Sequence, residues 1–320
     1  MIQEMKKKSN KSLLIYHKNK VTLLVLISLF LSGCGAQRIL KTSTKDSISY
    51  FAPGVVNTEN LEVNTVFNND FTEMFFTRRI AKSFIIHHSE YKNGKWQKPQ
   101  PIFMFKDKSR KSVAIDPTIT KDGKKMYFLG INPNDYAKKS PPDIYVSNNI
   151  NGKWQTAKKL PAHVSTEKYA ESYPIVVNDG SLYFSSNRPG GFGKRDLYRA
   201  QYLGDDKFSE PVNVGAPIND RNSSRSTYIT PDEKYLIATK SNGEKGFSIS
   251  KKENDKWQPL KDLSINKKIN QRWDYFCPYI TPNGKYFFFT RKIGYTRKHK
   301  WDSVKNSEVQ FIKLDKYFFN

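Results

Sequence analysis

A turn followed by a short aromatic strand recurs five times along this 320-residue chain, and this recurrence constrains the fold most strongly. The strand cores are too short for helices and rich in aromatic residues, which favours buried strands. They end at intervals of 52, 56, 54 and 51 residues, at Phe76, Phe128, Phe184, Ala238 and Phe289. The turns before them are Asn69-Asp70, Asp122-Gly123, Asp179-Gly180, Asp232-Glu233 and Asn283-Gly284. Any fold for this chain must therefore contain a structural unit of about fifty residues.

Further strand signals flank each core. In the third repeat, Tyr173-Pro-Ile-Val176 precedes the core and Asp196-Leu-Tyr198 follows it. Asn-Gly turns at Asn93-Gly94 and Asn151-Gly152 introduce a fourth strand, and Asn-Gly is the strongest short hairpin signal. Four antiparallel strands at this period predict an all-β propeller, because one sheet with two apolar faces must stack on others to bury both. We expect five four-stranded blades; six blades of about 45 residues are the alternative.

The fifth repeat lacks a fourth strand after Ile312. Tyr50-Phe-Ala-Pro53 near the other end matches the fourth-strand segments Trp96-Gln-Lys-Pro99 and Phe208-Ser-Glu-Pro211. The sequence therefore predicts that the amino-terminal strand completes the last blade and closes the ring.

The amino-terminal segment has the pattern of a targeting signal. Residues 1–20 carry six lysines, and an apolar run follows from Val21 to Ser32, too short to span a bilayer comfortably. Leu31-Ser-Gly-Cys34 resembles the lipobox of bacterial lipoproteins, which implies cleavage before Cys34 and lipidation of that residue; an ordinary secretory signal with a chance cysteine is the alternative. We expect a signal peptide at 1–33, the lipidated cysteine with a flexible tether at 34–47, and the propeller at 48–320.

This organisation predicts the location and the partners in the membrane. We expect a lipid-anchored protein of the bacterial cell envelope, at the outer membrane and facing the periplasm, because residue 35 is Gly and no acidic run follows Cys34. The formal net charge is +24, but the lysines are scattered through turns, which favours a solvated surface over nucleic-acid binding. With Cys34 lipidated, Cys277 has no disulfide partner and is expected to be a small core residue.

The third repeat carries the most specific family resemblance. Glu171-Ser-Tyr-Pro174, Asp179-Gly180, Tyr183-Phe-Ser-Ser-Asn-Arg-Pro-Gly-Gly191 and Asp196-Leu-Tyr198 resemble the WD40-like β-propeller repeat of TolB-type periplasmic proteins. The resemblance implies a non-catalytic binding or scaffold module of the envelope, with a protein or glycan partner. TolB itself usually has six blades and an extra domain, so its own partners are not carried over to this chain.

Three acids form a candidate binding site at one mouth of the predicted channel. Asp116, Glu171 and Asp274 each lie near the start of a first strand, and first strands line a propeller channel. An acidic mouth would suit a cationic group, whereas the opposite mouth would carry Lys124, Lys234 and Lys285. The alternative function is a glycan-processing enzyme that uses these acids in catalysis. A further alternative is that they accept hydrogen bonds from backbone donors.

Aromatic residues of the fifth repeat form a candidate binding surface made of Trp273, Tyr275, Tyr295 and Trp301; packing between loops is the alternative. His87 and His88 are adjacent on a predicted strand and so point to opposite faces, which is unfavourable for a shared metal. Gly190-Gly-Phe-Gly193 lacks the ending of a phosphate-binding loop and is interpreted as a strand connection. We expect no metal, no cofactor and no catalytic residue.

Overall fold

The structure is a computed structural model, and it describes residues 47–81, 83–106, 113–133, 141–221, 226–240, 244–293, 306–314 and 318–319. These residues belong to one compact unit, Ser43–Asn320. They form β-strands and a short 3₁₀ helix, η1 (Ser264–Lys267), so the prediction of an all-β fold is confirmed. In the described ranges no helix has the length and apolar character needed to cross a membrane.

The described strands form one ten-stranded, one five-stranded, two four-stranded and one two-stranded sheet. We divide the ten-stranded sheet at its one parallel pair, assign the two-stranded hairpin to the neighbouring four-stranded sheet, and call the five resulting groups sheets 1 to 5 in chain order. Sheet 1 contains β2 (Glu62–Phe67), β3 (Glu73–Ile80), β4 (Ser83–Lys92), β5 (Lys95–Trp96) and β6 (Gln100–Ile102). Sheet 2 contains β7 (Val113–Ile119), β8 (Lys125–Ile131), β9 (Asp143–Ile150), β10 (Lys153–Trp154) and β11 (Lys158–Lys159). A single parallel pair, Phe84 with Val113, joins these two sheets.

Sheet 3 contains β12 (Glu171–Val176), β13 (Leu182–Ser186), β14 (Asp196–Ala200) and β17 (Val212–Asn213), beside the small hairpin of β15 (Tyr202–Gly204) and β16 (Lys207–Phe208). Sheet 4 contains β18 (Thr227–Ile229), β19 (Tyr235–Thr239), β20 (Phe247–Glu253), β21 (Lys256–Trp257) and β22 (Lys261–Asp262). Sheet 5 contains β23 (Tyr275–Ile280), β24 (Tyr286–Ile293), β25 (Asn306–Lys313) and β1 (Ser49–Tyr50). The same antiparallel order thus recurs along the chain.

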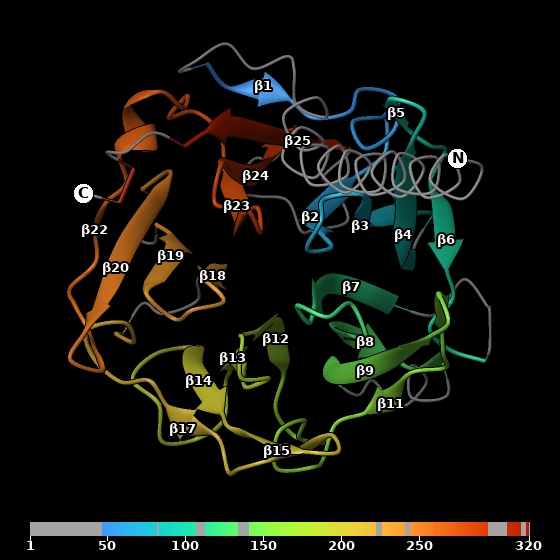
Figure 1. Cartoon of the computed structure of the whole chain (residues 1–320). Coiled ribbons are helices and arrows are strands. Elements are labelled where there is room, and N and C mark those ends of the chain that lie inside the picture. The colour runs from blue at the N-terminus through green and yellow to red at the C-terminus, as the bar shows by residue number, and fades with distance from the viewer. Residues whose placement is uncertain are drawn as a thin grey trace, which may run out of the picture. The chain divides into compact units, whose positions relative to one another are not determined.

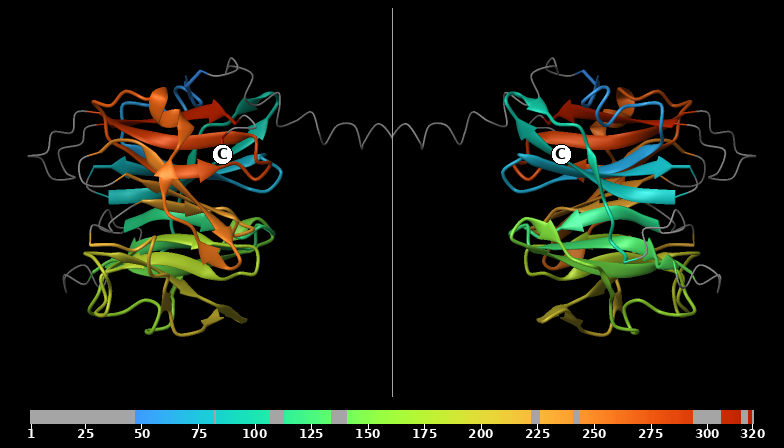
Figure 2. Two further views of the ribbon diagram at one scale, coloured as in Figure 1. Left: turned by 90° about the vertical axis from the view of Figure 1, so that its left-hand side faces the viewer. Right: turned by 90° about the vertical axis from the view of Figure 1, so that its right-hand side faces the viewer.

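The first strand of each sheet lies nearest the middle of the unit, and later strands lie farther out (Figure 1). Many strands run roughly along the viewing direction of Figure 1, as the two side views show (Figure 2). Hydrogen bonds connect the sheets in chain order. They run from Asp116 N to Thr77 Oγ1, from Val176 N to Thr118 Oγ1, from Asn178 N to Pro231 O, and from the Tyr228 hydroxyl to Ile280 O.

The amino-terminal strand lies at the outer edge of sheet 5. In β1, Ser49 pairs with Phe311 and Tyr50 pairs with Gln310 of β25. The Asn57 side chain donates a hydrogen bond to Val309 O and accepts one from Val309 N, at 2.8 and 2.7 Å. Residues from the two ends of the unit therefore share one sheet, and the backbone of β25 is satisfied on its outer side.

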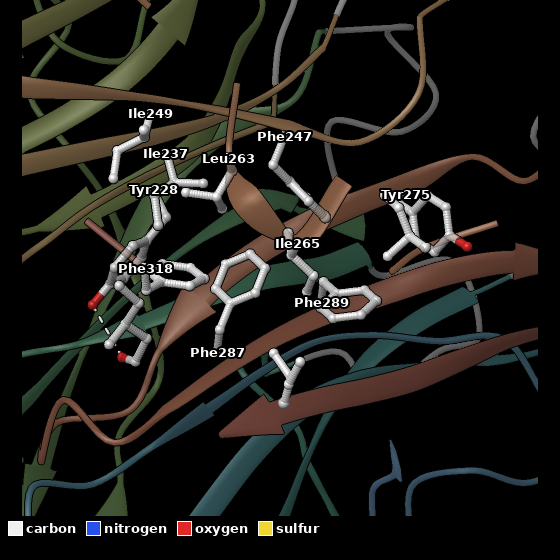
Figure 3. Close-up of a cluster of buried hydrophobic side chains, with 13 residues drawn as sticks. Tyr228, Ile237, Phe247, Ile249, Leu263, Ile265, Tyr275, Phe287, Phe289 and Phe318 are labelled. Atoms are coloured by element: carbon white, nitrogen blue, oxygen red, sulfur yellow. Dashed lines mark hydrogen bonds between the residues drawn. The ribbon is translucent and has the colours of Figure 1, made fainter. Parts of the chain in front are cut away.

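The continuous aromatic run of β24 packs on both faces of its sheet. Phe287 and Phe289 face sheet 4, where their rings lie 5.2 and 5.6 Å from the ring of Phe247. Phe288 faces sheet 1, with its ring 5.1 Å from that of Phe67. Figure 3 shows the first of these interfaces, where Phe318 packs beside Phe287. Two buried faces explain why apolar residues do not alternate with polar ones along this strand.

The inner hairpin of sheet 4 has a residue other than glycine at a position where the backbone φ is positive. Glu233 occupies the position that Gly123, Gly180 and Gly284 occupy in the other inner hairpins, and its φ is +56°. Its carboxylate accepts hydrogen bonds from the Tyr183 hydroxyl at 2.5 Å and from Arg199 Nε at 3.0 Å, both in sheet 3. These bonds between sheets offset the strain of a left-handed conformation outside glycine.

Candidate functional site

Four of the innermost strands contain a bulge whose central residue is not glycine but has a positive φ. These residues are Asn64, Asp116, Tyr173 and Cys277, with φ values of 52°, 57°, 52° and 50°. The pairing register of β2, β7, β12 and β23 shifts at these positions. A bulge turns a side chain away from the regular alternation of a strand. We call these four residues, together with Ser226 of sheet 4, the inner cluster.

The members of the inner cluster lie close to one another. The Cys277 amide donates a hydrogen bond to Ser226 Oγ at 3.0 Å, and the Asn64 backbone hydrogen bonds to the Cys277 thiol. Burial raises the pKa of Cys277 well above its usual value, and the nearby Asp116 carboxylate raises it further. Burial also raises the pKa of Tyr173, with Asp116 again adding to the effect. Strands far apart in sequence therefore bring these side chains together, and the predicted burial of Cys277 is confirmed.

Asp116 is the acid of this cluster, and it is 5% exposed. Burial raises its pKa from 3.8 to about 7. Its backbone amide donates to Thr77 Oγ1 at 3.2 Å, but its carboxyl group has no hydrogen-bond partner in the described parts of the chain. A buried carboxyl group without a donor or a counter-charge is costly, so this group is available to a bound molecule.

A cavity of about 550 Å³ extends from the inner cluster to the turns of the inner hairpins. Asn64, Tyr173 and Cys277 line it at the level of the cluster, and Lys121 and Lys234 line it at the turns. Much of the wall is aromatic or proline, including Phe67, Pro117, Pro174, Tyr228, Tyr235, Pro278, Tyr279 and Phe319. The rings of Tyr235 and Phe319 stack at 4.4 Å. This volume lies within the usual range of small-ligand pockets.

A smaller cavity of about 180 Å³ shares Tyr173 and Ser226 with the larger one, so the inner cluster lies between the two. Its charged lining consists of Lys240, Glu244, Lys245, Asp274 and Lys292. The Lys245 ammonium forms an ion pair with Asp274. Three lysines and two acids among the described residues line this cavity, so its lining is not predominantly acidic.

The three candidate acids occupy three different environments. Glu171 is fully buried within sheet 3, where its carboxylate accepts hydrogen bonds from Ser186 Oγ at 3.0 Å, from Thr166 N at 3.0 Å and from Arg188 Nη2 at 3.2 Å. Asp274 is paired with Lys245 in the smaller cavity, and Asp116 belongs to the inner cluster. Neither cavity is lined by all three, because the acids stand at different positions along their strands relative to the bulge.

The candidate aromatic surface is also divided. Tyr275 is 7% exposed, packs against Phe247 and Phe289, and donates its hydroxyl to Asn270 O at 3.2 Å, so it is a core residue. The Arg291 guanidinium lies over the Trp273 ring, 5.2 Å from its centre. Tyr295 and Trp301 lie outside the described residues, as does Cys34. For Tyr275 the structure therefore shows packing within the protein, which was the alternative interpretation.

The paired histidines lie on opposite faces of β4, as predicted. His87 stacks on Phe76 and donates from Nδ1 to Ile85 O at 3.0 Å, and burial lowers its pKa to about 4. His88 stacks on Phe75 on the other side. Among the described residues, no group of three or more His, Cys, Asp or Glu side chains is arranged to hold a metal ion.

Sequence reasoning did not find Asn64, Tyr173 or Cys277 as members of a site. A signal was present, because Pro follows the bulge residue at Asp116-Pro117, Tyr173-Pro174 and Cys277-Pro278. Proline cannot donate to a β-ladder, and within strands it is found at edges and bulges. The recurring proline in an inner strand therefore marked the point where each strand turns a side chain toward its neighbours.

Comparisons with known proteins bear on the fold. No protein-family model matches this sequence. A search of curated protein sequences also gave no match. Among solved structures, the catalytic domain of a GH62 α-L-arabinofuranosidase from Coprinopsis cinerea is similar, with a TM-score of 0.52, 11% identity, and 81% of this chain and 91% of that chain covered.

Two further solved structures illustrate the range of matches. The α-L-arabinofuranosidase of Podospora anserina in complex with cellotriose has a TM-score of 0.50 at 13% identity, with 82% of this chain and 92% of that chain covered. TolB from Acinetobacter baumannii has a TM-score of 0.44 at 12% identity, with 80% of this chain and 55% of that chain covered. The arabinofuranosidases are β-propellers, and at such identities the likeness shows the fold alone. The chain has a β-propeller fold.

Proposed function

We propose that this protein is a lipid-anchored β-propeller of the bacterial cell envelope that binds a ligand or a segment of a partner in its larger cavity and does not catalyse a reaction. The observation that carries the proposal is the cavity of about 550 Å³, whose wall is mostly aromatic, aliphatic, proline and threonine residues and whose charges lie toward the hairpin turns. Binding pockets of this size are typically apolar with few polar groups, which set the orientation of the ligand.

Site-specific photo-cross-linking in the native envelope tests this proposal. A photo-reactive amino acid at Asn178, an exposed residue that lines the larger cavity, should form an adduct with the bound molecule. The same amino acid at Lys158, exposed on the outer strand β11, is the matched control and should not form that adduct. Identical adducts at both positions, or none at Asn178, would contradict binding in the cavity.

A glycan-processing enzyme is the alternative, and it needs two carboxyl groups placed on either side of a glycosidic bond. Glu171 is held by Arg188 and Asp274 by Lys245, so Asp116 is the acid of the inner cluster that remains available. This distribution supports binding over hydrolysis. Arabinose release from arabinoxylan by the wild-type protein, abolished by Asp116→Asn, would overturn the proposal.

The proposed architecture has five blades, one for each of sheets 1 to 5, with β1 closing the ring. The pairing of β1 with β25, and the hydrogen bond from Phe67 N of sheet 1 to the Tyr279 hydroxyl of sheet 5 at 3.3 Å, support it. Deleting residues 48–57 should lower the free energy of unfolding by several kcal/mol, a large part of the roughly 5–15 kcal/mol of a typical domain. Deletion of the tether, residues 36–45, is the control. Equal stability of the two deletions would count against closure by β1.

The proposed anchor is the lipid on Cys34. We expect Cys34→Ala to move the protein from the membrane fraction to the soluble periplasm, because the thioether link would be lost. Cys277→Ala removes the other cysteine, which is buried in the propeller, and should stay with the membrane. Retention of the Cys34 variant in the membrane fraction would show that the lipobox interpretation is wrong.

A further inference from the structure

The inner cluster contains several polar groups that the protein itself does not use. The Asp116 carboxyl group is 95% buried, since the residue is 5% exposed, and it has no hydrogen-bond partner in the described ranges. The Tyr173 hydroxyl and the Asn64 carboxamide also make no hydrogen bond with the described residues, although both side chains line the larger cavity. Polar groups that are buried in native proteins are normally satisfied. Asn64 and Tyr173 are half-buried and face the cavity, so the Asp116 carboxyl is the one buried group of the three that lacks a partner among the described residues.

The backbone holds these groups in place at an energetic cost. Asn64, Asp116 and Tyr173 all have left-handed backbone conformations, with φ between 52° and 57°. Such conformations are unfavourable for residues other than glycine, and they concentrate at binding sites. For a bulky residue such as Tyr173 the conformation is a clear outlier. We attribute this strain to preorganisation, because it holds the side chains of the inner cluster in position for a bound molecule.

The wall of the larger cavity next to the cluster offers ring faces. The Tyr228 hydroxyl donates to Ile280 O at 3.1 Å, and the Tyr279 hydroxyl accepts from Phe67 N at 3.3 Å. These two phenols are thus engaged in contacts between sheets, and their rings pack edge to face at 5.3 Å. Aromatic faces attract both apolar groups and organic cations.

We propose that the inner cluster recognises the ammonium group of an organic amine whose apolar body occupies the larger cavity. This rests on the proposed function, because it uses the same cavity. An ammonium group has three donors, which match the Asp116 carboxylate, the Tyr173 hydroxyl oxygen and the Asn64 carboxamide oxygen. The bond to the carboxylate is charge-assisted and therefore the strongest of the three. Asp116 itself is not among the residues that line the cavity, but the next residue, Pro117, lines it together with Tyr173 and Cys277, and the Asp116 charge raises the pKa values of those two side chains.

The cations near the inner cluster include Lys292, whose charge opposes the rise in the pKa of Cys277, and Arg195, whose charge opposes the rise in the pKa of Tyr173 and whose side chain donates to Ser172 Oγ at 2.8 Å. Lys121 and Lys234 are exposed at the turns, where salt screens them over about 8 Å at physiological ionic strength. In the smaller cavity, Lys245 is paired with Asp274 and Lys240 with Asp262. Burial alone shifts the pKa of Asp116, so the nearby cations do not already serve as its partner.

A pair of matched probes tests the proposal. Benzylamine and benzyl alcohol share an aromatic body that fits the cavity and differ in the charge of the head group. Their dissociation constants would be measured by calorimetry at pH 8, where the Asp116 carboxyl is mostly ionised. We expect benzylamine to bind the wild-type protein at least about tenfold more tightly, which corresponds to about 1.4 kcal/mol. Asp116→Asn should abolish this preference, whereas Glu59→Gln, at an exposed carboxylate, should keep it.

Tyr173→Phe provides a second variant that leaves the Asp116 charge in place. It should weaken benzylamine binding a few-fold and leave benzyl alcohol binding nearly unchanged if the alcohol lies deeper against the apolar wall. Equal affinity for the two probes, or a preference that survives Asp116→Asn, would overturn the inference while leaving the cavity as a binding site. Failure of both probes to bind would also overturn it, and the cross-linking at Asn178 would then decide the proposed function separately.

Discussion

Two regions of the propeller bury a carboxylate in opposite ways. At the start of β12, Glu171 accepts hydrogen bonds from Ser186 of β13 and from Thr166 and Arg188 in the adjoining loops. At the start of β2, Glu62 is likewise fully buried and accepts from Arg78 Nε at 2.8 Å. Two positions farther along an inner strand, at the bulge, Asp116 is buried without a donor for its carboxyl group among the described residues.

The difference shows what these buried acids do. At the strand start, an arginine from β3 (Arg78) or from the loop after β13 (Arg188) reaches the carboxylate, so the acid stabilises its own sheet. At the bulge, the backbone turns the side chain away from its own sheet and toward other sheets, where none of the described residues forms an ion pair or a hydrogen bond with the carboxyl group. The first kind of acid is structural, whereas the second is available for binding. Four changes would break or sharpen this comparison.

The largest effect is expected from Glu171→Ala. The substitution leaves Arg188, Ser186 and Thr166 without their acceptor in a buried site, and breaking a buried ion pair costs about 3–5 kcal/mol. Urea denaturation of the variant should show this loss in the free energy of unfolding. Glu167→Ala, at an exposed acid nearby, should change stability by less than about 0.5 kcal/mol. A loss below 1 kcal/mol for Glu171→Ala would remove the structural role assigned to this acid.

Asp116→Asn should act in the opposite direction. Burial raises the pKa of Asp116 from 3.8 to about 7, so between these pH values the folded state binds a proton that the unfolded state releases. The free energy of unfolding of the wild-type protein should therefore fall as the pH rises from about 4 to 7, by at most about 4 kcal/mol at about 1.4 kcal/mol per pKa unit. The Asn variant should lose this slope and be the more stable protein at pH 8. A less stable variant at pH 8 would mean that the carboxylate has a partner.

His87 provides a buried titratable group whose pH dependence has the opposite sign. Burial lowers its pKa from 6.5 to about 4, so the unfolded state binds the extra proton between these values. This contribution is fully present above pH 6.5 and is lost as the pH falls to 4, by at most about 3 kcal/mol. His87→Gln should flatten the acid limb of the stability curve, with His88→Gln as the control on the other face of β4. An unchanged acid limb in the His87 variant would contradict its burial in the neutral form.

The smallest effect is expected from a difference between the two structural acids. Glu62 Oε2 has no hydrogen-bond partner among the described residues, whereas Glu171 Oε2 accepts from Thr166 N at 3.0 Å. Glu62→Gln should therefore cost about 1 kcal/mol or less, and Glu171→Gln should cost more, because an amide NH₂ cannot accept that bond. Thermal unfolding of the two variants at one pH would measure the difference. A larger loss at Glu62 would reverse this ranking of the two sites.

The lining of the cavities shows where prediction from sequence failed. The prediction that Asp116, Glu171 and Asp274 share one mouth treated the first strands as regular and alike. The bulges changed the direction of the side chains, and Lys240, Lys245 and Lys292 arrived from later strands or the loops beside them. Tyr275 was placed on a surface because it belongs to a set of aromatic residues in the fifth repeat, yet it packs in the core between sheets 4 and 5.

The sequence by itself determined the repeating unit of this protein. Turn signals and short apolar runs at a period near fifty residues specify antiparallel hairpins, and these depend on hydrogen bonds and alternation between residues close in the chain. Only the tertiary structure decided which side chains meet in the middle. Asn64, Asp116, Tyr173 and Cys277 come from four strands and are separated by 52, 57 and 104 residues along the chain, and their proximity depends on left-handed bulges and on the packing of whole sheets. Neither of these is encoded by local periodicity.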